Sequence, residues 1–184
     1  MKIQISRVDQ NAFTEFVNRL KSIDTFLYFK LRKGNVESAV YLPQRDAVKM
    51  HTLPITEMFT VEGGLPEGKE IKIAFFDAGK VLDAIKMFQN DQISAEIELI
   101  ENEEDFVAST VKLFNQELEI TLICSEPTLG FKDLTDSQIE TIFSREGSEF
   151  DFTLDTFTLG KIRSLFSLDK DDTFEINANG ASVR

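Results

Sequence analysis

A Gly-Lys pair, Gly79-Lys80, stands between a β-rich run and a helical pattern, which is where a phosphate-binding loop places its own Gly-Lys. That loop also needs a glycine five residues earlier and a Ser or Thr immediately after the lysine, because its backbone amides wrap the phosphates and its hydroxyl reaches Mg²⁺. Here those positions hold Ala74 and Val81. The pair therefore does not indicate a nucleotide site.

The other residue types that carry chemistry are sparse. His51 is the only histidine, which excludes a His–His metal pair or a histidine relay within one chain. Cys124 is the only cysteine, so no internal disulfide forms, and its apolar run "LEITLIC" predicts a buried, inert thiol. The acidic run 169–175 lacks the glycine of a Ca²⁺ loop. We predict no catalytic residue, no metal and no cofactor, and hence no enzyme.

Composition and charge narrow the class further. The chain has 184 residues, with 42% hydrophobic and 28% charged residues, an ordinary globular composition. No apolar run is long enough for a signal sequence or a membrane span, which with the single cysteine predicts a cytoplasmic location. The net charge of −12 argues against a nucleic-acid partner unless the positive charges are clustered.

Periodicity predicts a mixed α+β fold. A strand "KIQIS" precedes a helix over 7–22, and two strands follow around a Lys33-Gly34-Asn35 turn, where Gly or Asn adopts positive φ. Residues 47–54 read as a further strand, and 62–70 as a loop. A strand over 70–76 leads through Gly79, expected to let the chain turn, into a helix over 78–90. Three alternating strands then predict an antiparallel meander over 92–100, 105–114 and 118–124.

The pattern divides the chain into three regions. Residues 1–124 form a first domain of two repeat units, and 125–148 a connector whose short helix begins with a Thr135–Gln138 capping box. Residues 149–184 form a partial second domain. A shift of 81 residues places Gly79-Lys80-Val81 on Gly160-Lys161-Ile162 and aligns the flanking apolar positions, so the chain carries three copies of one strand–helix–sheet unit.

Positive charge gathers on the predicted helices. The spans 7–22, 78–90 and 159–168 hold seven basic and three acidic residues, whereas the rest holds 13 basic and 29 acidic. A helical wheel puts small polar residues opposite the apolar stripe of the first and third helices, with basic residues at their flanks. On a single helix, two effects explain such a bias without any partner. Cations near the C-terminus complement the macrodipole, and the aliphatic stems of Lys and Arg pack beside the apolar stripe. Three helices biased alike favour a shared phosphate-attracting surface.

With this order of elements, basic helices and acidic sheets, the chain resembles the sliding clamps, the DNA polymerase processivity factors. The stretch from Ile71 to Ile100, followed by an acidic turn, a meander and "DLTDSQIETIF", is most similar to the clamps of tailed bacteriophages. The resemblance implies a DNA-clamp fold with its helices on one face, and a trimeric ring around duplex DNA held without sequence preference. It also implies partners in a polymerase and a clamp loader, and the cytoplasm of a bacterial host. The DNA-facing candidates are Arg7, Asn11, Arg19, Lys21, Lys80, Lys86, Lys161 and Arg163.

One departure and two alternatives accompany the resemblance. A clamp subunit has four units and this sequence contains three, so we expect a C-terminally incomplete subunit with an open sheet edge that does not close into a ring alone. An acidic interaction module, such as a DNA mimic, explains the charge of −12 but predicts no basic helices. A small-molecule enzyme needs a polar catalytic pocket, for which the sequence offers no residues.

Overall fold

The chain folds into two compact units, Met1–Thr141 and Ile142–Arg184. The computed structural model describes residues 1–21, 25–42, 47–66, 68–89, 91–102, 105–127, 132–143, 161, 176–178 and 181–183. In the second unit, β11 (Ile176–Ala178) pairs antiparallel with β12 (Ala181–Val183). None of the helices in the described part of the chain is both long and apolar enough to cross a bilayer.

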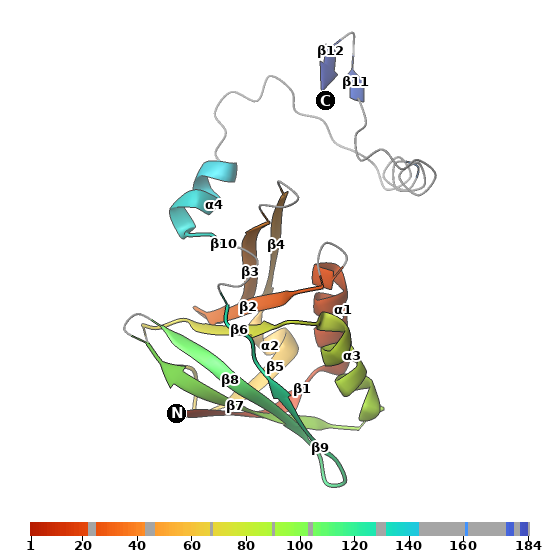
Figure 1. Cartoon of the computed structure of the whole chain (residues 1–184), viewed down its shortest axis with the longest axis vertical. Helices are drawn as coiled ribbons and strands as arrows, with labels where there is room; N and C mark the ends of the chain where they lie inside the picture. The colour runs from red at the N-terminus through yellow and green to blue at the C-terminus, as the bar shows by residue number, and fades with distance from the viewer. Residues whose placement is uncertain are drawn as a thin grey trace. The chain divides into compact units, whose positions relative to one another are not determined.

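The first unit is built on one mixed sheet (Figure 1). Ten strands contribute, in the order β10-β3-β2-β6-β8-β7-β1-β5, with β4 paired to β3 and β9 to β8. The strands are β1 (Lys2–Val8), β2 (Leu27–Arg32), β3 (Asn35–Leu42), β4 (Ala47–Pro54), β5 (Phe59–Glu62), β6 (Ile71–Phe75), β7 (Ile93–Glu101), β8 (Phe106–Phe114), β9 (Glu119–Ile123) and β10 (Lys132–Asp133). The helices are α1 (Gln10–Lys21), α2 (Ile55–Met58), α3 (Ala78–Met87) and α4 (Asp136–Phe143), which crosses the boundary between the units. The mixed α+β class predicted from the sequence is confirmed.

Two runs of elements interleave in this sheet. The series β1-α1-β2-β3-β4 and β6-α3-β7-β8-β9 have the same order. The first strand of each series pairs antiparallel with the second strand of the other, β1 with β7 and β6 with β2. The last three strands of each series form an antiparallel meander. The predicted third copy lies almost entirely outside the described residues.

The N-terminal boundary of the first helix corrects the sequence prediction. The helix begins at Gln10 rather than at residue 7, so Arg7 lies at the end of β1. Asp9 sets this start, because its Oδ1 accepts a hydrogen bond from Ala12 N at 2.9 Å, as a capping side chain does. The helix predicted over 78–90 is α3, which ends at Met87 instead of residue 90.

The β2–β3 turn and the segment from β4 to β5 can also be compared with the sequence predictions. In the β2–β3 turn the positive φ angles belong to Lys33 (48°) and Gly34 (77°), whereas Asn35 already begins β3. A two-residue turn with both central residues at positive φ matches the twist of the strands that it joins. The strand over 47–54 is confirmed, but α2 and β5, which follow it, were not predicted.

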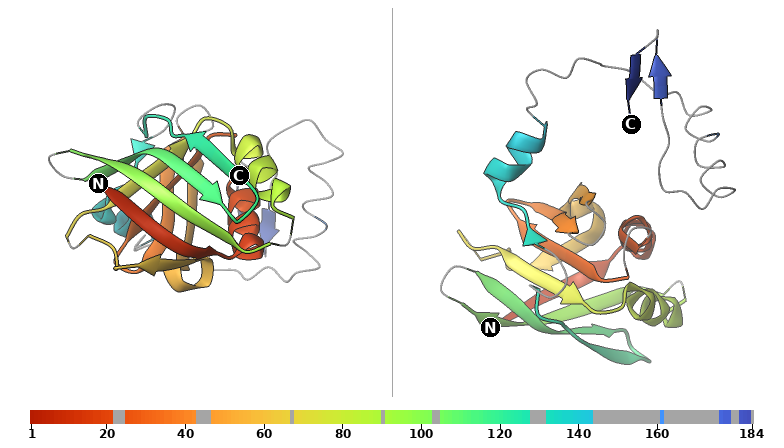
Figure 2. Two further views of the ribbon diagram at one scale, coloured as in Figure 1. Left: turned by 90° about the horizontal axis from the view of Figure 1, so that it is seen from below. Right: turned by 45° about the horizontal axis from the view of Figure 1, so that its top comes forward.

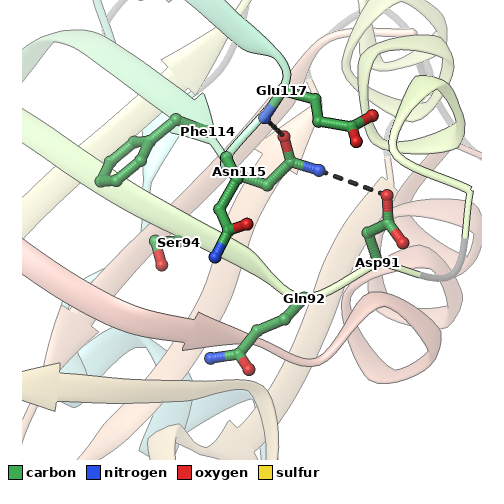
Figure 3. Close-up of a pocket in the computed structure, with 7 residues that line it drawn as sticks. Asp91, Gln92, Ser94, Phe114, Asn115 and Glu117 are labelled. Atoms are coloured by element: carbon green, nitrogen blue, oxygen red, sulfur yellow. Dashed lines mark hydrogen bonds between the residues drawn. The ribbon is translucent and has the colours of Figure 1, made fainter.

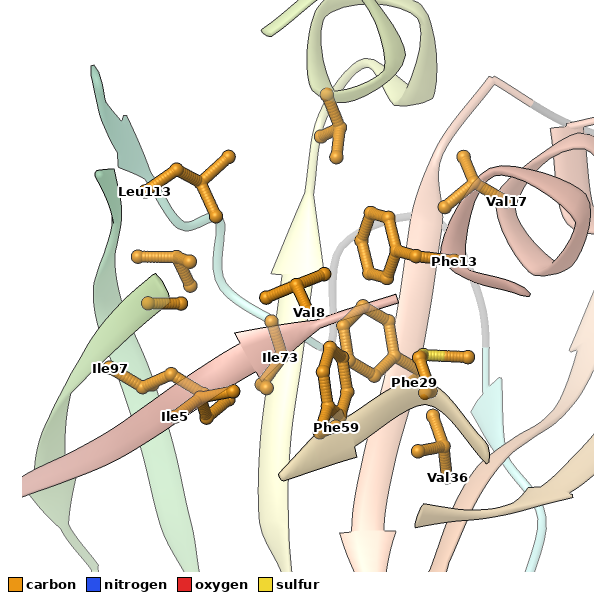
Figure 4. Packing of buried hydrophobic residues seen from close by; sticks show 14 of the residues in the cluster. Ile5, Val8, Phe13, Val17, Phe29, Val36, Phe59, Ile73, Ile97 and Leu113 are labelled. Carbon is orange, nitrogen blue, oxygen red and sulfur yellow. The ribbon is translucent and has the colours of Figure 1, made fainter. Parts of the chain in front are cut away.

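The sheet curls around a single large apolar core (Figure 4). On β2, Leu27, Phe29 and Leu31 belong to this core, and Phe29 meets Phe13 and Phe16 of α1 edge-on, with ring centroids 6.3 and 5.8 Å apart. Because successive residues of a strand point to opposite faces, Tyr28 and Lys30 lie on the side of the sheet away from α1. Helices therefore cover one side of β2, and a separate set of residues covers the other.

Candidate nucleic-acid interface

Helices α1 and α3 lie side by side and run in opposite directions (Figures 1 and 2). At one end, Ala78 N at the start of α3 donates to Thr25 O, just after α1, at 2.8 Å. At the other end, the Gln10 side-chain amide at the start of α1 donates to Asp91 O, just after α3. Hydrogen bonds at both ends thus fix the pair as one surface.

The outer side of this pair is polar apart from the exposed Met87, and its inner side is apolar. Phe13, Phe16, Val17 and Leu20 of α1, and Val81, Leu82 and Ile85 of α3, are buried against the sheet. The exposed side chains of the two helices include Asn11, Glu15, Asn18, Arg19, Lys21, Lys80, Asp83 and Lys86. Of the charged ones, four are basic and two acidic, so this helix face carries net positive charge on a chain of net charge −12.

Half of the basic side chains on the helix face are paired within their own helix. Arg19 pairs with Glu15, and Lys86 Nζ lies 3.5 Å from Asp83 Oδ1, all four side chains being more than half exposed. Exposed pairs of this kind contribute little to stability and exchange partners readily. Lys21 and Lys80 form no ion pair with any residue in the described ranges. All four cations are therefore available to an incoming anion.

The Gly79-Lys80 pair acquires a different explanation from the structure. Asp77 caps α3, its Oδ1 accepting a hydrogen bond from Gly79 N at 2.7 Å. A Cβ on residue 79 would lie 2.9 Å from that same oxygen. Gly79 does not adopt positive φ, so its part in the turn from β6 into α3 is the space that it leaves beside the Asp77 carboxylate. The missing side chain of Gly79 thus leaves room for the Asp77 carboxylate that caps α3. Lys80 follows on the first turn and is exposed.

Arg7 and Asn11 lie at the end of the helix pair where α1 begins. Both line a groove of about 430 Å³ together with Asp9, Gln10 and Gln92. The Arg7 side chain is 65% exposed and its Nη2 lies 3.7 Å from Asp9 Oδ2. Although it belongs to β1, Arg7 thus borders the helix face on which the sequence analysis had placed it.

A second polar groove of about 550 Å³ shares Asp91 and Gln92 with the first (Figure 3). Its amides hold turns together: Asn115 Oδ1 accepts from Glu117 N and Leu118 N, while Asn115 Nδ2 donates to Asp91 Oδ2 at 3.3 Å. Gln92 Nε2 and Ser94 Oγ both donate to Ser6 O at the β1 bulge. This groove was not predicted from the sequence, although Gln92 in the turn after α3 and Asn115 and Gln116 in the β8–β9 turn were the available signal.

The other singled-out residues do not belong to α1 or α3. Lys161 is exposed, and Arg163 lies outside the described residues. His51 on β4 stacks on Phe16 at 5.1 Å between ring centroids, and burial together with the nearby Arg19 charge lowers the pKa of its imidazole. Burial raises the pKa of the Cys124 thiol to about 12, which makes it a poor nucleophile near neutral pH. Within the described ranges no cluster of His, Cys, Asp and Glu has the arrangement of a metal site.

Comparison with known proteins adds no assignment to this geometry. No protein-family model matches the chain, and no curated protein sequence matches it significantly.

Proposed function

We propose that this chain is a subunit of a DNA sliding clamp, a processivity factor that encircles duplex DNA and tethers a replicative polymerase. The observation that carries the proposal is the helix face: two antiparallel helices with four exposed basic side chains stand on an otherwise acidic protein. Phosphate attraction without base reading is what a sliding protein requires.

The rest of the first unit supports the same proposal. Exposed carboxylates are numerous on the described strands and connecting segments, namely Glu62, Glu98, Glu101, Glu117, Glu119 and Glu126. An acidic exterior repels DNA and leaves the helix face as the favourable approach. The interleaved series of strands and helices match the repeated units of the clamp resemblance. The proposal requires three kinds of partner: further copies of this chain in a ring, a clamp loader and a polymerase.

Duplex DNA at low salt tests the interface directly. We expect a 20-base-pair duplex to shift the backbone amide resonances of α1 and α3, and raising the salt to reverse the shifts, because counterions compete for the cations. Lys21→Glu with Lys80→Glu should abolish the shifts. The matched control is Lys2→Glu with Lys112→Glu, which reverses two cations on β1 and β8 and should leave them unchanged. Shifts confined to the sheet strands, or equal losses in both variants, would contradict the interface.

Topology tests the ring. With the loader and ATP present, a form of the protein that closes into a ring should be retained on circular duplex DNA and escape from the ends of linear DNA. Charge reversal at Lys80, Lys86, Lys161 and Arg163 should impair loading and sliding. Binding to a basic protein and never to DNA would instead support the acidic DNA mimic.

A further inference from the structure

The outer side of β2, away from α1, carries a dense network of charged side chains. Four cations and five carboxylates take part: Lys30, Arg32, Lys33 and Lys72 with Glu37, Glu70, Asp105, Asp133 and Asp136. They come from β2, β3, β6, β10, α4 and the turns before β3, β6 and β8. None of these residues belongs to the helix face.

Lys30 is the centre of this network and is only 2% exposed. Its ammonium lies 3.2 Å from Asp133 Oδ1, 3.6 Å from Glu70 Oε2 and 4.0 Å from Glu37 Oε1. Tyr28 Oη donates to the other oxygen of Asp133 at 2.9 Å. Burial and the Asp133 charge raise the pKa of Tyr28 well above its ordinary value, so the hydroxyl stays a donor. Asp133 is thereby held by two buried side chains of β2.

Arg32 makes the second connection. Its Nε and Nη2 donate to the two oxygens of Glu37, each at 2.9 Å, and Nη1 donates to Glu70 at 3.0 Å. Nη2 also donates to Asp136 Oδ1 at 2.5 Å, and Lys33 Nζ lies 3.6 Å from the other oxygen of Asp136. Each of the three guanidinium nitrogens of Arg32 thus donates to at least one carboxylate.

The segment that carries Asp133 and Asp136 has few other attachments. β10 pairs with β3 over two residues only, Lys132 with Tyr41 and Asp133 with Val40. Leu134 N donates to Ala39 O at 3.0 Å, and its side chain is 7% exposed. The large core that holds the sheet together contains no residue of this segment. The ionic contacts of Asp133 and Asp136 therefore stand beside only a short strand pairing and one buried apolar side chain in holding residues 132–136.

We propose that this network is an ionic clasp, in which Asp133 and Asp136 hold β10 and the start of α4 on the sheet, and that neutralising the two carboxylates undocks this segment while the sheet stays folded. The device is independent of DNA binding. The clasped segment shortly precedes the boundary between Met1–Thr141 and Ile142–Arg184. Opening the clasp therefore shifts the point at which the chain leaves the sheet.

The test is residue-resolved hydrogen exchange on the full chain carrying Asp133→Asn and Asp136→Asn. We expect the amides of Leu134 and Ile139, which bond to Ala39 O and Thr135 O, to exchange at least about tenfold faster than in the wild type. Amides paired between β7 and β8 should keep their rates, because their core contacts are untouched.

A matched control neutralises two carboxylates outside the clasp. Glu96→Gln with Glu119→Gln removes partners of Lys2 and Lys112 and should leave Leu134 protected. Asp136→Glu keeps the charge within reach of Arg32 and should also exchange like the wild type. The clasp is refuted if the Asn variant leaves Leu134 and Ile139 as slow as the control does. It is equally refuted if β7 and β8 accelerate as much as Leu134, which would mean general destabilisation, or if Asp136→Glu opens the segment too.

Discussion

The helix face and the ionic clasp use the same residue types in opposite ways. On the helix face, Lys86 and Asp83 form an exposed pair 3.5 Å apart, and Lys80 has no ion-pair partner in the described ranges. In the clasp, Lys30 is almost wholly buried and lies within 4.0 Å of three carboxylates. The two regions stand on opposite sides of β2.

The difference separates charges that serve a partner from charges that serve the fold. A solvated lysine keeps its water and gives it up only to an incoming anion, so it contributes little until a partner arrives. A buried lysine has lost its water, and its carboxylate neighbours must replace it completely. Burial, more than residue type, therefore distinguishes the two roles in this protein.

The largest effect that tests this contrast is expected from Lys30→Met. The side chain keeps its bulk but leaves Glu37, Glu70 and Asp133 without their shared ammonium, which should lower the free energy of unfolding by about 3–5 kcal/mol. Urea unfolding of the full chain measures it. Lys86→Met on the helix face is the control and should change stability by less than about 0.5 kcal/mol. Equal losses in the two variants would erase the distinction.

Acid should open the clasp before it unfolds the sheet. The Arg32 hydrogen bond and charge hold the pKa of Asp136 below its ordinary value. A carboxyl with a lowered folded-state pKa contributes stability above its unfolded value of about 3.9, and this contribution is lost as pH falls through the lower folded value. The opening of Leu134, measured as its exchange rate divided by the intrinsic rate at each pH, should thus be constant above about pH 5 and rise below about pH 4. Arg32→Gln should move that rise to higher pH, and an unchanged profile would contradict the assignment.

A smaller effect is expected at the helix start. Asp77→Ala removes the acceptor for Gly79 N and should cost about 1 kcal/mol, with faster exchange in the first turn of α3. Asp77→Asn, which keeps an acceptor, should cost less. If Asp77→Ala left both stability and exchange at the wild-type level, the cap would not be what positions Lys80.

The smallest effect should be seen at His51. The chain contains one histidine, so its imidazole resonance titrates alone in an NMR experiment. Arg19→Gln removes a positive charge that helps to lower this pKa and should therefore raise it. In the wild type the neutral imidazole suits the folded state, so stability is full above about pH 6.5 and declines as pH drops toward the lower folded value. An unmoved pKa would show that the helix-face charge is fully screened from the residues beneath it.

Local signals in the sequence predicted much of the fold. The meander β7-β8-β9 followed from strict alternation, and the Thr135–Gln138 capping box forms as predicted, with Thr135 N donating to Gln138 Oε1 at 3.0 Å and Gln138 N to Thr135 Oγ1 at 3.3 Å. The start of α1 was misplaced, although Asp9 was available as an N-cap signal. The short α2 and β5 were missed because each spans only four residues, too few to show a period.

The candidate interface was more predictable than the clasp. Apolar spacing alone determines which side of α1 and α3 faces water, so the exposed basic residues could be inferred from a helical wheel. The clasp joins Lys30 to Asp133, 103 residues apart, and alternation along β2 gives Lys30 only a side of the sheet. Whether that side meets water or another segment depends on where residues 132–136 return, which no local pattern specifies.

The exchange of first strands between the two series also determines how the protein can fold. Although β1 also pairs with β5 and β6 with β8, the other neighbour of β1 is β7 and that of β6 is β2, so neither series completes its sheet alone. These pairings join distant parts of the chain, so folding must bring both series together early and proceeds more slowly than for a protein of local contacts. A chain cut between Glu62 and Ile71 would give two fragments that gain structure only on meeting. The duplicated halves are thus one cooperative folding unit, and each acts as the template for the other.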